Sequence, residues 1–156
     1  MIDIDVPGRR IFHLQYGVFD LNGTLALDGR LRDGAAERLR VLADRLDLHI
    51  WTGDSHGTAA DAVAGLPVKL AIVPQQNQAE AKQTLLRSLG AAATVAVGNG
   101  YNDRLVLSEA ALSIVVIERE GSAVEALNAA DIVCPGIIDA LDMLMNPRRI
   151  VATLRA

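Results

Sequence analysis

The feature that most constrains the fold of this chain is an alternation of short apolar runs with amphipathic segments. Parallel strands covered on both faces of a sheet are nearly continuous in apolar residues, because both faces lie in the core. The segments between the runs place apolar residues at helical spacing, as in residues 33–46. Strands that alternate with helices predict an α/β fold with a doubly wound parallel sheet. The runs are YGVFD (16–20), LHIWT (48–52), VKLAIV (68–73), TVAVG (94–98), LSIVVIE (112–118) and DIVC (131–134).

The first fifteen residues lie outside this alternation. MIDIDV alternates apolar and polar side chains, PG is typical of a turn, and IFHLQY alternates again. This pattern predicts a β-hairpin or two short strands. The length of 156 residues suits one domain with a core of its own. We therefore expect a single domain over residues 1–156, with an N-terminal hairpin extension at 1–15.

Composition narrows the class of protein. The net charge is -4 and no long basic stretch is present, which argues against nucleic acid or an anionic membrane as partner. No apolar run is long enough to span a bilayer, and the N-terminus lacks the apolar core of a signal peptide, so we expect a cytoplasmic protein. Cys134 is the single cysteine, which excludes an intrachain disulfide and favours a buried small hydrophobic residue.

Polar residues follow three of the apolar runs directly. Asp20 ends the first run, Thr52 ends the second, and the sequence GNGYND (98–103) follows the fourth, while Lys82 lies in the helical segment before it. In an open parallel sheet, ligands bind beyond the carboxyl ends of the strands. We therefore expect these groups to meet in one crevice.

The stretch FDLNGTLALDG (19–29) has three interpretations. Asn22-Gly23 between apolar residues is a signal for a tight β-hairpin. Residues 22–24 also match an N-glycosylation sequon, but a glycan requires the secretory route and nothing in the sequence directs the chain there. In the third interpretation, Asp20 is a carboxylate that accepts a phosphoryl group.

Phosphoryl transfer needs a cation and contacts to phosphate. Mg²⁺ prefers oxygen ligands, which Asp20, the backbone carbonyl of Asn22, and Asp103 or the side-chain oxygen of Asn99 would supply. Backbone N–H groups and hydroxyls suit phosphate oxygens, and an ammonium group neutralises charge shared by phosphate and nucleophile. The expected phosphate contacts are Gly23, Thr24, Thr52, Gly53 and Lys82.

Each of these residues also has a structural interpretation when taken alone. Asp20 suits a turn at a strand end, Thr52 suits a helix entry, and Lys82 suits the solvated face of a helix. GNGYND suits a glycine-rich turn and does not fit the dinucleotide-binding fingerprint. The order of the groups and their placement at strand ends favour a shared site.

Four segments, in their order and spacing, resemble the four motifs of the haloacid dehalogenase-like hydrolase superfamily: FDLNGTL, IWTGD, Lys82 and VGNGYNDRLVL. The likeness is greatest to the phosphorylation domain of P-type ATPases, which carries an Asp-x-x-Gly-Thr loop, a Thr-Gly-Asp and a Gly-Asp-Gly-x-Asn-Asp loop. Without membrane helices or a nucleotide-binding insert, the chain resembles the soluble P-type ATPase-like proteins.

The resemblance implies roles and a topology. It implies that Asp20 is the nucleophile and a Mg²⁺ ligand, that Thr52 and Lys82 contact phosphate, and that residues 98–103 form the loop on the metal side. It also implies a three-layer α/β/α sandwich with a strand order of 5-4-1-2-3 and a small flap over residues 24–34.

Two asparagines depart from the family pattern. Many phosphatases of the family have an acid where this chain has Asn22, and an amide cannot transfer protons at neutral pH. General acid–base catalysis contributes typically 10²–10⁴-fold, so we expect slow hydrolysis. Asn99 stands where the ATPase loop has a metal-binding aspartate, which would leave Asp103 as the main acidic partner of Asp20.

The intervals 25–51 and 53–81 leave no room for a cap domain, so we expect an open site that suits a large substrate or an oligomer. The hairpin and residues 141–154 are candidate oligomer contacts, although the favoured interpretation of Met143 and Met145 is that they fill the core. The leading hypothesis is a Mg²⁺-dependent phosphatase acting on a phosphorylated small molecule or macromolecule. One alternative is a pseudo-enzyme that binds Mg²⁺ and a phosphorylated ligand or regulates a partner. Another is a receiver-like signalling domain.

Overall fold

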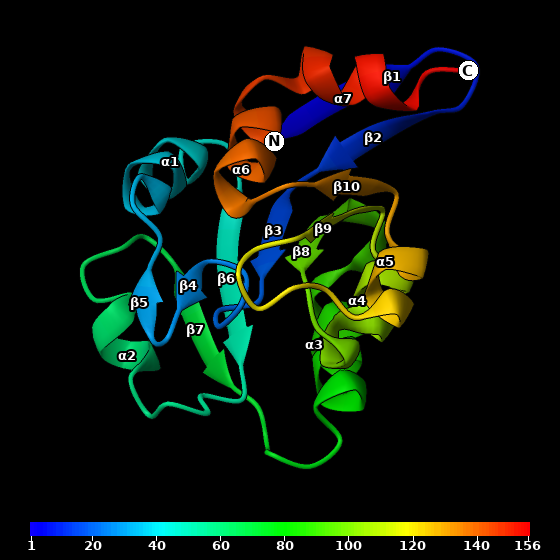
Figure 1. The fold of residues 1–156 in the computed structure, drawn as a ribbon. Coiled ribbons are helices and arrows are strands. Elements are labelled where there is room, and N and C mark those ends of the chain that lie inside the picture. The colour runs from blue at the N-terminus through cyan, green and yellow to red at the C-terminus, as the bar shows by residue number, and fades with distance from the viewer.

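The centre of the molecule is a six-stranded sheet in which every neighbouring pair of strands is parallel (Figure 1). The computed structural model describes all of residues 1–156. Each of the six apolar runs forms one strand, so the predicted parallel sheet is confirmed. The predicted order of five strands is also found, and a sixth strand extends the edge beside the fifth. Across the sheet the order is β10 (Ile132–Cys134), β9 (Leu112–Val116), β8 (Thr94–Gly98), β3 (Tyr16–Phe19), β6 (Asp47–Thr52) and β7 (Lys69–Ile72).

Helices cover both faces of the sheet and complete the predicted three-layer sandwich (Figure 1). Side chains of a strand alternate between the two cores, so that Phe19 points into one and Val18 into the other. One core receives side chains from α1 (Ala35–Leu42), α2 (Ala59–Ala62) and α6 (Ile137–Met145). The other receives them from α3 (Gln78–Leu89), α4 (Arg104–Glu109) and α5 (Val124–Ala129).

The N-terminal hairpin is present as predicted. Strands β1 (Ile2–Val6) and β2 (Arg10–Leu14) pair antiparallel, and β1 buries every second side chain. The hairpin packs against α7 (Pro147–Leu154), the helix that ends the chain (Figure 1). The two segments that we considered for oligomer contacts therefore bury their apolar faces against each other. Met143 and Met145 pack against the core, as the simpler interpretation predicted.

The flap is a second, much smaller hairpin. Strands β4 (Ala26–Leu27) and β5 (Arg30–Leu31) pair antiparallel around Asp28 and Gly29, which have φ of 51° and 80°. Positive φ at both central residues is the geometry that a tight hairpin requires. The tight turn that Asn22-Gly23 could have formed is therefore found six residues later, at Asp28-Gly29. The chain has no cap domain, as expected.

The ends of two helices and the single cysteine complete the description of the fold. Helix α2 is a single turn, and the Asp54 carboxylate accepts the N–H of its first residue, Ala59, at 2.9 Å. Helix α3 ends at Leu89, and Gly90 follows it as the C-cap. Cys134 is buried, and burial first, then the charge of Asp139, raises the pKa of its thiol to about 11. None of the helices combines the length and the apolar composition that crossing a membrane requires.

Candidate active site

Three charged side chains meet at the carboxyl end of the central strands. Lys82 Nζ donates to Asp20 Oδ1 at 2.7 Å and to Asp103 Oδ1 at 2.8 Å. Asp20 directly follows β3, Asp103 ends the 3-10 turn after β8, and Lys82 lies on α3. The exposed fractions are 8% for Asp20, 2% for Lys82 and 4% for Asp103. The interpretation of Lys82 as a solvated helix lysine is therefore wrong.

The position of Lys82 follows from the buried stripe of α3. Ala79, Lys82 and Leu86 are three and four residues apart, so they lie on one face of the helix, and all three are buried. A buried ammonium group is costly unless it is paired. The two aspartates satisfy this requirement, because both lie at the strand ends toward which this face of α3 points.

Burial and pairing set the charges of the three groups. Burial and then the charge of Asp103 raise the pKa of Asp20 to about 6, although Lys82 and the backbone of Leu21 act in the opposite direction. Burial alone would lower the pKa of Lys82, but the charges of Asp103 and Asp20 outweigh it and raise that pKa above its ordinary value. Lys82 therefore carries a positive charge at neutral pH, and Asp20 is mostly ionised there.

Above Asp20 lies an open pocket of about 260 Å³ whose lining residues are all polar or glycine. It brings together Asp20, Asn22, Thr52, Gly53 and Asn99, which sequence analysis placed in one site. Lys82 and Asp103 lie beneath it, around a much smaller internal cavity that Asp20 also lines. The pocket is also lined by Gly100 and Asn102 of the GNGYND loop, which sequence analysis placed at the site, and by Ser55, Gln78 and Glu120, which it did not.

Thr52 is well placed to contact a ligand in this pocket. It is buried at the end of β6, and its hydroxyl oxygen accepts the N–H of Asp54 at 3.0 Å. The hydroxyl proton is therefore left to donate to an oxygen in the pocket. Gly53, the next residue, has the Gln78 amide packed against it, since an added Cβ would lie 2.6 Å from Gln78 Nε2.

Two expected phosphate contacts are engaged within the nucleophile loop. The N–H of Gly23 donates to the carbonyl of Ala26 at 2.8 Å. The hydroxyl of Thr24, which is fully buried, lies 3.4 Å from Asp20 Oδ2 and 3.1 Å from Asn99 Oδ1. These groups tie the loop to its neighbours, and their contact with phosphate stays a prediction.

The oxygen atoms around the pocket fit a magnesium ion. No group of three or more His, Cys, Asp or Glu side chains could hold a metal, but Mg²⁺ is commonly bound through one or two carboxylates and keeps several waters. Asn22 Oδ1 is buried without a hydrogen-bond partner, and Asn22 lines the pocket beside Asp20. A buried oxygen without a partner costs free energy unless a donor or a cation reaches it.

The four predicted metal ligands differ in how free they are. Asp20 and Asn22 face the pocket, whereas Asp103 Oδ1 accepts from Lys82 and its Oδ2 accepts the N–H groups of Asn99 and Gly100, both at 3.0 Å. Asn99 Oδ1 already accepts from Thr24. Direct metal ligation by Asp103 and Asn99 stays a prediction.

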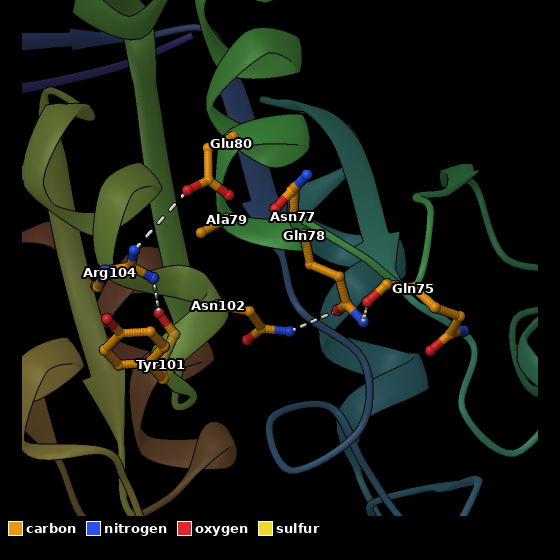
Figure 2. Close-up of a pocket in the computed structure, with 8 residues that line it drawn as sticks. All are labelled: Gln75, Asn77, Gln78, Ala79, Glu80, Tyr101, Asn102 and Arg104. Carbon is orange, nitrogen blue, oxygen red and sulfur yellow. Dashed lines mark hydrogen bonds and ion pairs between the residues drawn. The ribbon is translucent and has the colours of Figure 1, made fainter.

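A second cavity, of about 510 Å³, shares lining residues with this pocket. Figure 2 shows the side chains that line it. Gln78 and Asn102 line both spaces, and Asn102 Nδ2 donates to Gln78 Oε1 at 2.8 Å between them. Most of its lining is polar, and Arg104 lies over the ring of Tyr101 at 3.9 Å. Two sequence signals were available for it: Asn102 belongs to the GNGYND loop, and Gln78 begins the helix that carries Lys82. The other lining residues are Gln75, Asn77, Ala79 and Glu80.

Two proteins of Methanocaldococcus jannaschii are similar in sequence. The uncharacterized protein MJ0073 is 48% identical over 61 residues, which are 39% of this chain and 66% of that protein. The uncharacterized protein MJ0072 is 42% identical over 38 residues, which are 24% of this chain and 86% of that protein. No family model matches the chain.

Solved structures of a phosphatase and of another hydrolase share the fold at low sequence identity. The 3-deoxy-D-manno-octulosonate 8-phosphate phosphatase of Moraxella catarrhalis, in complex with a magnesium ion, a phosphate ion and KDO, has a TM-score of 0.72 and 17% identity. The match covers 92% of this chain and 94% of that one. The haloacid dehalogenase-like family protein SP0104 of Streptococcus pneumoniae has a TM-score of 0.62 and 13% identity, over 83% of this chain and 98% of that one.

Proposed function

Since this chain belongs to the same family as the two Methanocaldococcus proteins and has the fold of the haloacid dehalogenase-like hydrolases, we propose that it is a Mg²⁺-dependent phosphatase acting through an aspartyl phosphate on Asp20. One observation carries the proposal. The carboxylate of Asp20 is held by Lys82 at 2.7 Å at the base of an open, fully polar pocket. A paired carboxylate with access to solvent-borne ligands is what nucleophilic attack on phosphorus requires.

The reaction has two steps. In the first, a carboxylate oxygen of Asp20 forms a bond to phosphorus, and the bond between phosphorus and the leaving oxygen breaks with its electron pair on that oxygen. In the second, water attacks phosphorus and loses a proton to solvent, the bond between phosphorus and Asp20 breaks with its electron pair on the carboxylate, and inorganic phosphate leaves. Lys82 offsets the negative charge at the nucleophile, and Thr52 donates its hydroxyl proton to a phosphate oxygen. Bound Mg²⁺ would neutralise charge on the phosphoryl oxygens.

Hydrolysis of the phospho-enzyme is the slow part of this proposal. Asn22 lines the pocket at the position where a proton carrier is needed, and an amide cannot take a proton from water at neutral pH. The leaving group must depart without an acid from this position. The Asp-x-x-Gly-Thr loop and the Thr-Gly-Asp segment support placing the chain with the soluble P-type ATPase-like proteins, whose phosphorylation-domain relatives also lack that acid.

The second cavity suggests a substrate class. Its amide side chains, from Gln75, Asn77, Gln78 and Asn102, offer donors and acceptors without net charge, which suits a hydroxyl-rich leaving group. The exposed ring of Tyr101 adds an apolar surface. We propose a phosphorylated small molecule of this kind, and the Moraxella phosphatase, whose structure holds a phosphate ion and a KDO molecule, supports this class.

The proposal is tested with p-nitrophenyl phosphate or acetyl phosphate and Mg²⁺, measuring turnover and covalent phosphate. We expect both signals in the wild type and neither in Asp20→Asn. Asp61→Asn, an exposed aspartate on α2, is the matched control and should behave as the wild type. Turnover in the wild type no higher than in Asp20→Asn would contradict an enzymatic function.

A pseudo-enzyme is the second candidate function, because Asn22 supplies no proton carrier and its Oδ1 has no partner. Such a protein would bind a phosphorylated ligand without turning it over. Binding of inorganic phosphate and Mg²⁺ without covalent phosphate on Asp20 would favour it.

A further inference from the structure

The loop between β9 and α5 brings a carboxylate to the pocket that sequence analysis did not single out. A Cβ added at Gly23 would lie 2.6 Å from Glu120 Oε2 and 2.6 Å from Asn99 Nδ2. The two side chains therefore meet over the backbone of Gly23, next to Asn22. The φ of Gly23 is 84°, so this position favours glycine on conformational grounds as well. Glu120 lines the same pocket as Asp20.

Asn99 holds this loop in place. Its Nδ2 donates to the carbonyl of Gly121 at 3.0 Å, and its backbone carbonyl accepts the N–H of Ala123 at 2.9 Å. Its Oδ1 accepts from Thr24, so both polar atoms of the side chain have partners. An ionised aspartate at position 99 has no proton to donate and would place an anionic oxygen beside the Gly121 carbonyl. The asparagine thus fixes the loop at the residue next to Glu120.

The carboxylate of Glu120 is free. Its neighbour Glu118 accepts the N–H of Ile137 at 2.8 Å and lies 3.5 Å from Arg32, whereas Glu120 has no hydrogen bond or ion pair. Among the residues that line the pocket, the carboxylates are those of Asp20 and Glu120. Both oxygens of Asp103 already accept from Lys82 or the loop amides. Glu120 is therefore the carboxylate that the pocket leaves available.

We propose that Glu120 is a ligand of the divalent cation and supplies the negative charge that Asn99 lacks. The donors would be the carboxylates of Asp20 and Glu120 and an oxygen of Asn22, all hard oxygen ligands of the kind that Mg²⁺ prefers. Asn99 would then act as a positioning residue for Glu120. The inference rests on the proposed function, because it takes the cation to serve phosphoryl transfer. Cation binding itself can be measured without turnover.

The test is a titration of the whole protein with Mn²⁺ alone, in which electron paramagnetic resonance reports the free ion. Glu120→Gln keeps the size of the side chain and removes its charge, and we expect the dissociation constant to rise by about 10-fold or more. Glu125→Gln makes the same change on the exposed side of α5 and should leave affinity unchanged. Thermal melts of both variants establish that they are folded.

The outcomes separate this inference from the proposed function. Weaker Mn²⁺ binding in Glu120→Gln alone supports the metal role, even if the wild type shows no phosphatase activity. Equal Mn²⁺ affinity in the wild type and Glu120→Gln, or no binding to the wild type, overturns the metal role. If Glu120→Gln lowers turnover at saturating Mg²⁺ with unchanged Mn²⁺ affinity, Glu120 acts on protons or substrate and the metal role is equally overturned.

Discussion

The floor and the rim of the pocket are built on different principles. In the floor (Asp20, Lys82 and Asp103), the charged groups are paired at 2.7 and 2.8 Å and almost fully buried. In the rim (Asn22 and Glu120), the side-chain oxygens have no partner in the protein. The protein itself therefore supplies all the charged neighbours of the nucleophile Asp20. In the rim, by contrast, the oxygen atoms of Asn22 and Glu120 remain free to contact a bound ion or substrate.

The largest effect on stability and turnover should come from removing the positive charge of Lys82 from the floor. Lys82→Met leaves Asp20 and Asp103 buried without their cation, and removing one partner of a buried ion pair costs about 3–5 kcal/mol. We expect that loss in urea unfolding, together with loss of turnover. Lys69→Met is the matched control, because Lys69 is 67% exposed and pairs with Asp47 at 2.7 Å. Its loss should be about 0–1 kcal/mol. Equal losses in the two variants would show that the floor is not specially stabilised.

A substitution in the rim should change the rate at which the phospho-enzyme is hydrolysed. Asn22→Asp restores a proton carrier beside Asp20, and we expect steady-state turnover to rise by about 10²–10⁴-fold. Asn128→Asp, on the exposed surface of α5, makes the same chemical change away from the pocket and should have no effect. An unchanged or lower rate in Asn22→Asp would mean that the missing proton carrier does not limit hydrolysis.

The smallest effect should be a gradual dependence of the phosphorylation rate on pH, which arises from the ionisation of Asp20 in the floor. Nucleophilic attack needs the ionised form of Asp20, and burial raises its pKa to about 6 in the protein without a cation, whereas bound Mg²⁺ would lower it. The phosphorylation rate should therefore fall on acidification, and the fall should begin at a lower pH at saturating Mg²⁺ than at low Mg²⁺. The measurement is the initial phosphorylation rate between pH 4 and 8.

The same raised pKa makes a prediction for stability. The fold favours the protonated carboxyl of Asp20, so its contribution is fully present below the ordinary pKa of 3.8 and is lost as pH rises through about 6. Relative to Asp20→Asn, the wild type should therefore lose stability over this range. Urea unfolding curves that keep a constant difference between the two proteins across this range would contradict the raised pKa.

The fold and the floor were largely predictable, because both depend on local pattern. Apolar runs that suit a doubly covered strand did form the sheet, and Asp20 and Asp103 follow two of those strands. Lys82 shares a helical face with Ala79 and Leu86, and burial of that face carries the lysine to the aspartates.

The rim was not predictable, because it depends on contacts distant in sequence. Glu120 reaches Gly23 only through the conformation of the β9–α5 loop, which Asn99 holds by its amide. No spacing or periodicity marks that contact. The Asn22-Gly23 hairpin signal failed for a related reason, since the loop adapts to Asp20 and Asn99 and the tight turn forms at Asp28-Gly29.

The central claim is that Asp20 becomes phosphorylated and that the phospho-enzyme is hydrolysed more slowly than it forms. Intact-protein mass spectrometry after a brief incubation with acetyl phosphate and Mg²⁺, followed by peptide mapping, measures this directly. We predict one added phosphoryl group, located on Asp20, that persists after the phosphoryl donor is removed. A protein without added phosphate, or one whose Asp20→Asn variant is labelled to the same extent, would contradict the account.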